Sequence, residues 1–309
     1  MAGFAGKSRM SKIWNSTRRP RLLSVLLTML LLPCFARAQE SVAVTEITPT
    51  TLVFATSSGN VVASVGQDGA LLVGTPSAGS TEAIGRALAG RTQSAARYLV
   101  ISPEAVEQSQ GDAGWGKRGA FVAMQENALR RLGGDVMGAP PPLSPRLLQL
   151  GVDRPRIAFS QVLAFDLNGE AIHIVHQQPG YSDADFLAHF HLAKTVYFGE
   201  VYPGDGYPEI DAAQGGALEG VLKTLQGWTD KTFHIVPARG KVTDGESVKA
   251  FCDMLVTVRD RVKTMASAGK TEDQIVAAHP TAEFDARWGH GRVSPDRFVR
   301  EVYEQGRVR

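Results

Sequence analysis

Histidine is the side chain that most often supplies a nitrogen ligand to a metal or a proton to a reaction near neutral pH, and the chain has seven histidines. Their spacing is informative in one place. His189 and His191 lie two residues apart in a strand-like segment, so their side chains share one face and could form half of a metal site. The sequence offers no third ligand at a matching spacing. The pattern therefore favours two polar residues on the face of a sheet.

Two other side chains have the chemistry of a nucleophile. Ser102 follows the strand-like run Tyr98–Ile101, but it is not part of a Gly-x-Ser-x-Gly turn and no histidine is nearby in the sequence to act as its base. Cys252 falls on the apolar face of an expected helix, which favours an inert core residue over a reactive thiol. Neither residue predicts covalent catalysis.

Short strands separated by turns are expected early in the chain. Ser57-Ser58-Gly59 and Gln67-Asp68-Gly69 have the composition of hairpin turns, and the runs around them are rich in apolar and β-branched residues. This pattern predicts an antiparallel meander. The expected strands are 51–55, 60–65 and 70–73, and they are followed by a helix near 82–88, a strand over 98–101, and a strand and helix within 120–132.

The second half of the chain restarts this pattern. An Asn-Gly pair at 168–169 separates two strand-like runs, 161–166 and 171–175, and is a strong hairpin signal. Two amphipathic helices follow, with a strand over 232–236 between them. Periodicity alone supports one α/β or α+β domain, and the repeated order of strands and helices suggests a four-layer αββα sandwich. The apolar stripes of the two helices are Leu218, Val221, Leu222 and Leu225, and Val248, Phe251, Cys252 and Leu255.

The first residues have the pattern of an export signal. Three arginines between residues 18 and 21 precede an apolar run, 22–32, and Ala36-Arg37-Ala38 supplies the small residues of a cleavage site. The apolar run is about eleven residues long, against the roughly twenty that span a bilayer, so cleavage is expected rather than anchoring. We expect residues 1–38 to be a signal peptide for the general secretory route, and residues 39–309 to form one periplasmic or secreted domain.

Composition limits the partners of the expected domain. Hydrophobic residues make up 43% of the chain and charged residues 21%, which is ordinary for a globular protein. The formal net charge of +2 includes the basic leader, and no run of Lys or Arg with interleaved aromatic residues follows it. We therefore expect neither nucleic acid nor, after cleavage, a membrane as a partner. Cys252 is the one cysteine beyond the leader, so no internal disulfide is expected.

Four segments resemble the metallo-β-lactamase superfamily, in particular its exported hydrolases related to quinoprotein relay-system and sulfur-oxidation-associated zinc hydrolases. Asn60–Val73 resembles the opening hairpin of that family, and Gly199–Asp211 resembles the stretch around its bridging metal ligand. The segments 251–255 and 280–289 are similar to its C-terminal helices. The likeness covers nearly the whole chain after the leader. It implies the αββα sandwich of the metallo-β-lactamase fold.

The resemblance also implies a dinuclear zinc site, but the ligand positions carry other residues. The family's ligands are a His-x-His-x-Asp-His cluster, a later His, a bridging Asp and a final His, which together activate a water. Alignment from the strand at 98–101, and the preserved context Ser182-Asp183-Ala184-Asp185, fix the equivalent positions. These are Pro103, Ala105, Glu107 and Gln108 for the cluster, Tyr181 for the later His, Glu200 for the bridging Asp, Arg239 for the final His and Gly74 for an early Asp.

Every nitrogen ligand of the family is therefore replaced. Proline and alanine have no donor atom, and a guanidinium stays protonated and repels a cation. Glu107 and Glu200 are good oxygen donors, while Tyr181 and Gln108 are weak ones. We predict no dinuclear zinc and no cofactor. A single oxygen-preferring cation such as Ca²⁺ on Glu107 and Glu200 is the alternative.

The replacements suggest a different kind of site. Under the implied fold Glu107, Glu200 and Arg239 converge, and the guanidinium would supply the positive charge that the metals supply elsewhere in the family. The alternative is three separate, solvated loop residues. Tyr181 is expected to fill space left by a metal, or else to donate a hydrogen bond to a ligand.

These residues predict an exported protein of the metallo-β-lactamase fold that lacks the zinc ligands and acts as a non-hydrolytic binding or accessory pseudoenzyme. Its ligand would be a small molecule or a periplasmic protein. The alternative is a hydrolase or lyase with Glu107 or Glu200 as general base and Arg239 as oxyanion stabiliser. The expected cleft is lined by Ser102, Glu107, Gln108, Tyr181, Asp185, Glu200 and Arg239.

Overall fold

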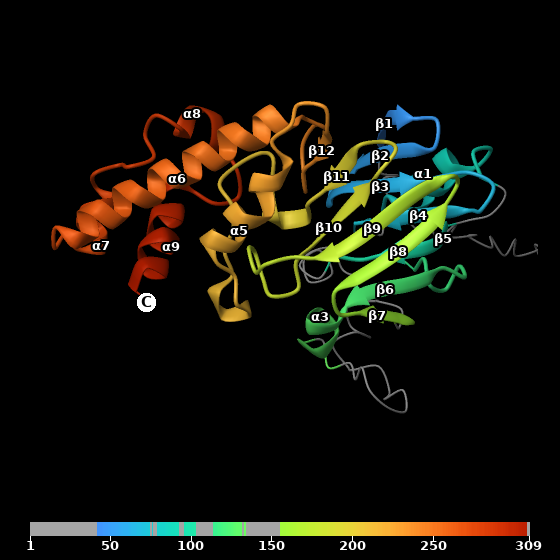
Figure 1. The fold of residues 1–309 in the computed structure, drawn as a ribbon, viewed down its shortest axis with the longest axis horizontal. Helices are drawn as coiled ribbons and strands as arrows, with labels where there is room; N and C mark the ends of the chain where they lie inside the picture. Colours follow the sequence, from blue (N-terminus) through green and yellow to red (C-terminus); the bar gives the residue numbers. More distant parts are fainter. Residues whose placement is uncertain are drawn as a thin grey trace, which may run out of the picture. The chain divides into compact units, whose positions relative to one another are not determined.

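Two β-sheets with helices form the structure, a computed structural model (Figure 1). It describes residues 42–74, 76, 79–92, 96–102, 114–131, 133 and 155–307. Pro103, Ala105, Glu107 and Gln108 lie outside the described residues. All described residues belong to one compact unit, Ala38–Arg309.

The first sheet has seven strands in sequence order. The first four form an antiparallel meander, and the last three run parallel to the fourth. Parallel neighbours need a crossover, and helix α1 (Thr81–Leu88) supplies the first one. The predicted meander, the helix and the strand that follows it are therefore confirmed, and the structure adds that this strand is parallel to β4. The strands are β1 (Ala43–Thr48), β2 (Thr51–Thr56), β3 (Gly59–Ser64), β4 (Ala70–Val73), β5 (Ala96–Val100), β6 (Phe121–Gln125) and β7 (Ile157–Phe159).

The second sheet has five strands in the order β12-β11-β10-β9-β8. Its first hairpin turns at Asn168 and Gly169, whose φ angles of 59° and 74° are both positive, as the predicted Asn-Gly turn requires. Its last two strands, β11 and β12, are parallel neighbours. The strands are β8 (Val162–Leu167), β9 (Glu170–His176), β10 (Phe186–Phe190), β11 (Thr195–Tyr197) and β12 (His234–Val236).

Three apolar clusters define four layers. One lies between the sheets, where side chains such as Val62 and Leu71 meet Ile174 and Phe190. A second joins the other face of the first sheet to α1 and to α3 (Glu126–Arg131). The third joins the outer face of the second sheet to the later helices. The αββα arrangement predicted from the order of elements is confirmed.

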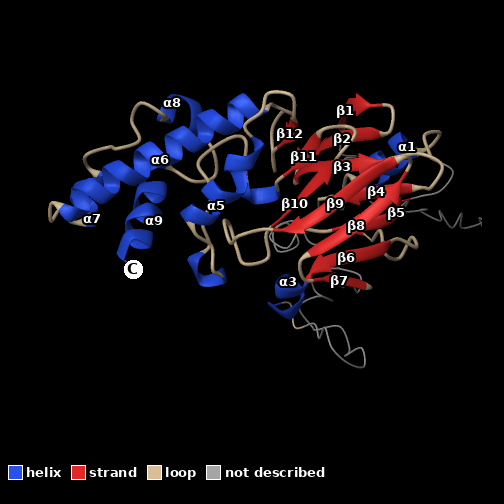
Figure 2. Ribbon diagram, in the orientation of Figure 1, coloured by secondary structure: helices blue, strands red, loops and turns tan. Residues whose placement is uncertain are grey.

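The later helices gather beside β11 and β12 (Figure 2). Both predicted apolar stripes are buried, and Cys252 is 6% exposed, with burial raising the pKa of its thiol to about 11, as expected of a core residue. Among the described residues no helix is long and apolar enough to cross a membrane. The helices are α5 (Leu218–Leu225), α6 (Gly245–Ser267), α7 (Glu272–Val276), α8 (Asp285–Trp288) and α9 (Pro295–Arg307), with the short 3-10 turns η1 (Gly199–Val201), η2 (Ala212–Gln214) and η3 (Gln226–Trp228).

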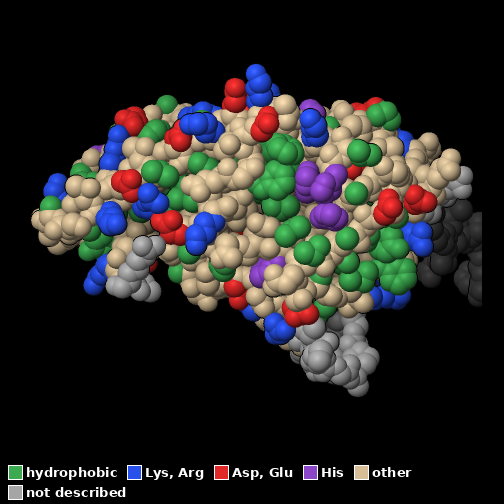
Figure 3. Space-filling model, in the orientation of Figure 1, with side chains coloured by type: hydrophobic (Ala, Val, Ile, Leu, Met, Phe, Trp, Pro, Cys, Tyr) green, Lys and Arg blue, Asp and Glu red, His purple; other side chains and the backbone are tan. Residues whose placement is uncertain are grey.

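The helices cover only part of the outer face of the second sheet. Leu187, Val196 and Ile235 pack under them. Farther along the sheet, Val162 on the edge strand β8 is 56% exposed, and the outward residues of β9 reach the surface. This part of the sheet face is visible in Figure 3.

Candidate functional site

Glu200 and Arg239 come together at one end of the second sheet. Glu200 lies in η1, directly after β11, and Arg239 lies in the loop after β12. Because β11 and β12 are parallel, the segments that follow them begin at the same edge of the sheet. The Arg239 guanidinium donates two hydrogen bonds to the Glu200 carboxylate, from Nη1 to Oε1 at 2.5 Å and from Nη2 to Oε2 at 2.7 Å. The hypothesis of separate, solvated loop residues is wrong for these two.

This ion pair is largely buried. The Glu200 side chain is 7% exposed and the Arg239 side chain 18%. Burial alone would lower the pKa of Arg239, but the hydrogen bonds and charge of Glu200, with the charge of Asp205, outweigh it and raise the pKa above its ordinary value. The Asp205 carboxylate lies 3.7 Å from Nε of Arg239, and Nη2 of Arg292 lies 3.8 Å from Glu200. The site is a charge-compensated cluster rather than an isolated pair.

Asn60, on β3 of the first sheet, holds the loop that carries Arg239. Its side-chain amide donates to the carbonyl oxygens of Pro237 at 2.9 Å and Gly240 at 3.0 Å, and its backbone N–H donates to Ala238 at 2.8 Å. The packing is close, since a Cβ at Gly59 would lie 2.6 Å from the Ala238 oxygen. No sequence pattern indicates this contact, because an Asn beside a glycine is ordinary in a hairpin.

The position aligned with the family's early aspartate also lies near the pair. Gly74 follows β4 directly and has a φ of 118°, and a Cβ built there would lie 3.4 Å from the Tyr197 hydroxyl. Tyr197, on β11, in turn interacts electrostatically with Arg239. Gly74, Glu200 and Arg239 therefore lie at one end of the two sheets.

Tyr181 and Asp185 belong to a tight loop between β9 and β10. The Asp185 carboxylate is buried and accepts four hydrogen bonds from its own loop: from the backbone N–H groups of Gly180, Tyr181 and Ser182 and from the Ser182 hydroxyl, at 2.7–3.0 Å. Asp185 therefore anchors the loop, and that bonding leaves it poorly placed to line a cleft. Tyr181 is 7% exposed, in agreement with a space-filling role.

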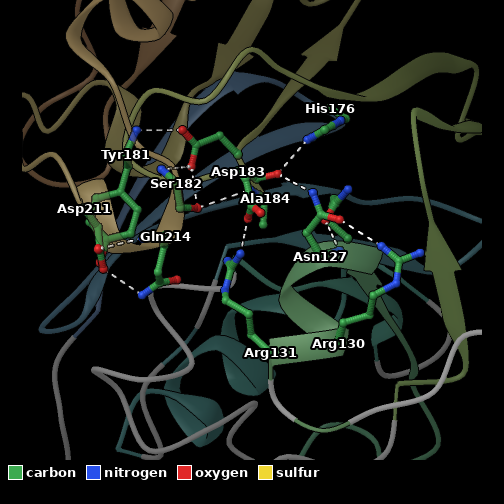
Figure 4. A network of polar contacts seen from close by, with 12 residues as sticks. Asn127, Arg130, Arg131, His176, Tyr181, Ser182, Asp183, Ala184, Asp211 and Gln214 are labelled. Carbon is green, nitrogen blue, oxygen red and sulfur yellow. Dashed lines mark hydrogen bonds and ion pairs between the residues drawn. The ribbon is translucent and has the colours of Figure 1, made fainter. Parts of the chain in front are cut away.

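The same loop is tied to both halves of the chain (Figure 4). Asp183 forms an ion pair with Arg131 of α3, and its carbonyl oxygen accepts a hydrogen bond from the Asn127 side chain at 2.7 Å. The His176 ring lies 2.9 Å from the same carbonyl oxygen. Asp183 thereby ties the loop that carries Tyr181 to α3 and to the end of β9.

The remaining predicted residues separate into two groups. Ser102 is 2% exposed, two residues after the end of β5. Glu107 and Gln108 lie outside the described residues, so their approach to Glu200 and Arg239 stays a prediction.

The donor set does not fit a dinuclear zinc site. In the part of the chain that the structure describes, no group of three or more His, Cys, Asp or Glu side chains is arranged to hold a metal ion. Both oxygens of Glu200 bind a guanidinium, whose positive charge would face any cation placed there. Glu200 and Arg239 therefore form an internal ion pair instead of offering a free carboxylate to a cation.

Comparison with known proteins decides the fold. No family model and no curated protein matches the sequence. Among solved structures, the chain is similar to the inverting sec-alkylsulfatase Pisa1 from Pseudomonas sp., at 14% identity over 85% of this chain and 50% of that one, with a TM-score of 0.57. It is also similar to a metallo-β-lactamase from Pontibacter korlensis, at 13% identity over 70% of this chain and 99% of that one, with a TM-score of 0.51. The chain has the metallo-β-lactamase fold.

The likeness extends to the fold alone at these identities. The chain spans about half the length of the alkylsulfatase, and a double mutant of that enzyme gives a similar match, with a TM-score of 0.59. The fold implied by the segments 60–73 and 199–211 is thus confirmed. The exported subgroup and the replaced ligands of this metallo-β-lactamase fold stay predictions.

Proposed function

We propose that this protein is an exported, non-hydrolytic binding or accessory protein, built on the metallo-β-lactamase fold with an ion pair in place of the metal centre. One observation carries the proposal. The buried, two-pronged pair between Glu200 and Arg239 lies at the positions that resemble the family's bridging carboxylate and final histidine. A chain can keep the fold and still lose the family's chemistry when these positions change.

The cost of disturbing the pair supports this proposal. Taking a charged group out of water is expensive, and a buried ion pair persists only when its geometry and hydrogen bonds compensate. Here two nitrogens of the planar guanidinium each donate a hydrogen bond to one oxygen of the carboxylate. Zinc binding at Glu200 would require that pairing to break, which would leave Arg239 with only the longer contact to Asp205.

The same geometry weighs against Glu200 as the base of a metal-independent hydrolase. A general base must reach the proton that it accepts. Glu200 is 7% exposed and both of its oxygens bind Arg239, so it presents no open acceptor to a substrate. Arg239 has its two Nη atoms engaged, and its Nε is buried without a hydrogen-bond partner. An oxyanion would have to compete with Glu200 for the guanidinium.

Hydrolysis assays test the proposal. The purified full chain is incubated with a secondary alkyl sulfate and with a cephalosporin, with added Zn²⁺ and separately with a chelator. We expect no turnover above the buffer control under either condition. Turnover that is abolished by the chelator, or turnover that is lost in Glu200→Gln while the variant stays folded, would refute the proposal.

A further inference from the structure

Three histidines gather on the outer face of the second sheet, away from the Glu200–Arg239 pair. His173 on β9 lies directly opposite His189 in the β9–β10 ladder, and His191 follows two residues after His189. Residues two apart on a strand share a face, so all three rings emerge on the same side. In Figure 3 histidine side chains gather there, next to hydrophobic side chains. The later helices do not cover this part of the sheet.

Two of the rings face each other closely. Nε2 of His191 lies 3.0 Å from Nδ1 of His173, and the ring centroids are 4.6 Å apart with an interplanar angle of 76°. His191 is exposed and His173 is half-buried. The pair is therefore open to solvent from one side.

His189 packs against His191 of this pair. The centroids of the His189 and His191 rings lie 3.9 Å apart, with an interplanar angle of 32°. The His189 ring also meets the Trp228 ring edge-on, with the centroids 4.9 Å apart. Burial, and next the charges of His191 and His173, lower the pKa of His189 to about 4.

We propose that His173 and His191 form a surface site that chelates one divalent first-row cation, through Nδ1 of His173 and Nε2 of His191. Two nitrogens bound to one such ion at about 2.0–2.1 Å each lie roughly 3 Å apart, which is the spacing found here. Neutral imidazole suits Cu²⁺, Ni²⁺ and Zn²⁺, with Cu²⁺ bound most tightly. Water completes the coordination on the exposed side.

Proton balance is simple at this site. The facing nitrogens now share one proton in a hydrogen bond, and binding requires a lone pair on both. On binding, this proton moves to the other nitrogen of the ring that carried it, so that each ring presents a lone pair to the ion. The site uses two side chains, and His189 stacks beside His191 instead of facing the shared point. It therefore does not need the three-residue cluster that is absent from the described residues.

Calorimetric titration with Ni²⁺ tests the site on the full chain purified without a histidine tag. We expect one Ni²⁺ per chain, and an affinity at least about tenfold weaker in His173→Ala and in His191→Ala. The control is His234→Ala, which removes an exposed histidine on β12 outside the cluster and should leave binding unchanged.

A spectroscopic readout separates this site from general surface binding. With Cu²⁺, the electron paramagnetic resonance spectrum should show coupling to nitrogen that is lost in His191→Ala, whose exposed side chain can be removed without disturbing the fold. The proposal is overturned if the wild type does not bind Ni²⁺, or if the two single variants bind it as the His234→Ala control does. Both results are independent of the hydrolysis assays, which concern the Glu200–Arg239 pair.

Discussion

At the scale of single residues, Arg239 determines what the site can do. A histidine at this position would offer a neutral nitrogen to a metal, whereas arginine brings a permanent charge that must be balanced. Glu200 balances it through two hydrogen bonds, and Asp205 and Arg292 extend the charge pattern. The Arg239 guanidinium thus supplies the positive charge of the site.

Removing one partner of the pair should destabilise the protein strongly. Arg239→Ala leaves Glu200 buried with the longer, 3.8 Å contact to Arg292, and we expect a loss of about 3 kcal/mol in the free energy of unfolding, near the lower end for a broken buried pair because Arg239 is partly exposed. Urea unfolding measures it. Lys249→Ala, which breaks the exposed pair with Asp253, serves as the control and should change nothing measurable. Equal effects of the two substitutions would show that the Glu200–Arg239 pair is not structurally important.

The sequence predicted the central pair but not its support. Glu200 and Arg239 were placed together through the resemblance, which supplies long-range proximity that composition cannot. Asn60 and Asp205 were missed because their contacts with the Arg239 loop depend on how the two sheets meet. The third histidine, His173, was missed for a similar reason: its pairing with His189 depends on strand register, which one sequence does not reveal.

At the scale of elements, the loop from Gly180 to Asp185 is anchored by one of its own side chains. Its shape is set by one carboxylate that accepts four hydrogen bonds. A carboxylate presents only acceptors, so every one of these donors is satisfied. The loop then fixes Tyr181 and connects to α3 through Asp183.

Asp185→Asn should therefore be costly although it changes few atoms. An amide replaces one acceptor oxygen by an NH₂ group that faces backbone N–H donors, and we expect a loss of about 2–3 kcal/mol in the free energy of unfolding. Thermal and urea unfolding give the comparison. Asp183→Asn is the matched control, since its side chain is 42% exposed and should cost less than about 1 kcal/mol. A milder effect at residue 185 than at residue 183 would contradict the anchoring role of Asp185.

Elements with a strong local signal were predicted well. The Asn-Gly hairpin between β8 and β9 has the expected positive φ angles. The apolar stripes of α5 and α6 are buried, as expected. Strands β1 and β7 were not predicted. Four of the six β1 residues are exposed, so it lacks a buried alternating face, and β7 has only three residues. Their place in the sheet comes from pairing with a neighbour.

At the scale of the whole molecule, a series of ion pairs leads from the site to the C-terminal helix. Arg292 lies between Glu200 and Glu209, and Arg297 on α9 binds Glu209 and Glu301. The hydrogen bonds of Arg297 and Arg292 lower the pKa of Glu209 despite its burial. These ion pairs connect the Glu200–Arg239 site to helix α9.

Export is the second property of the whole chain that can be tested. We expect the full-length protein, expressed in a bacterium with a periplasm, to be recovered from the periplasm with Gln39 as its first residue, because Ala36 and Ala38 are the small residues that the cleavage site requires. N-terminal sequencing checks the position. Retention in the cytoplasm with an intact leader would contradict the prediction, and Ala38→Phe should block cleavage.

The zinc content of the purified protein tests the central claim most directly. The chain is produced without a histidine tag in zinc-supplemented cells and analysed by mass spectrometry, with His173 and His191 both replaced by alanine so that the proposed surface site does not contribute. Because Arg239 occupies the carboxylate of Glu200, we predict no stoichiometric zinc. Two zinc ions per chain, the content of a dinuclear hydrolase centre, would contradict the account.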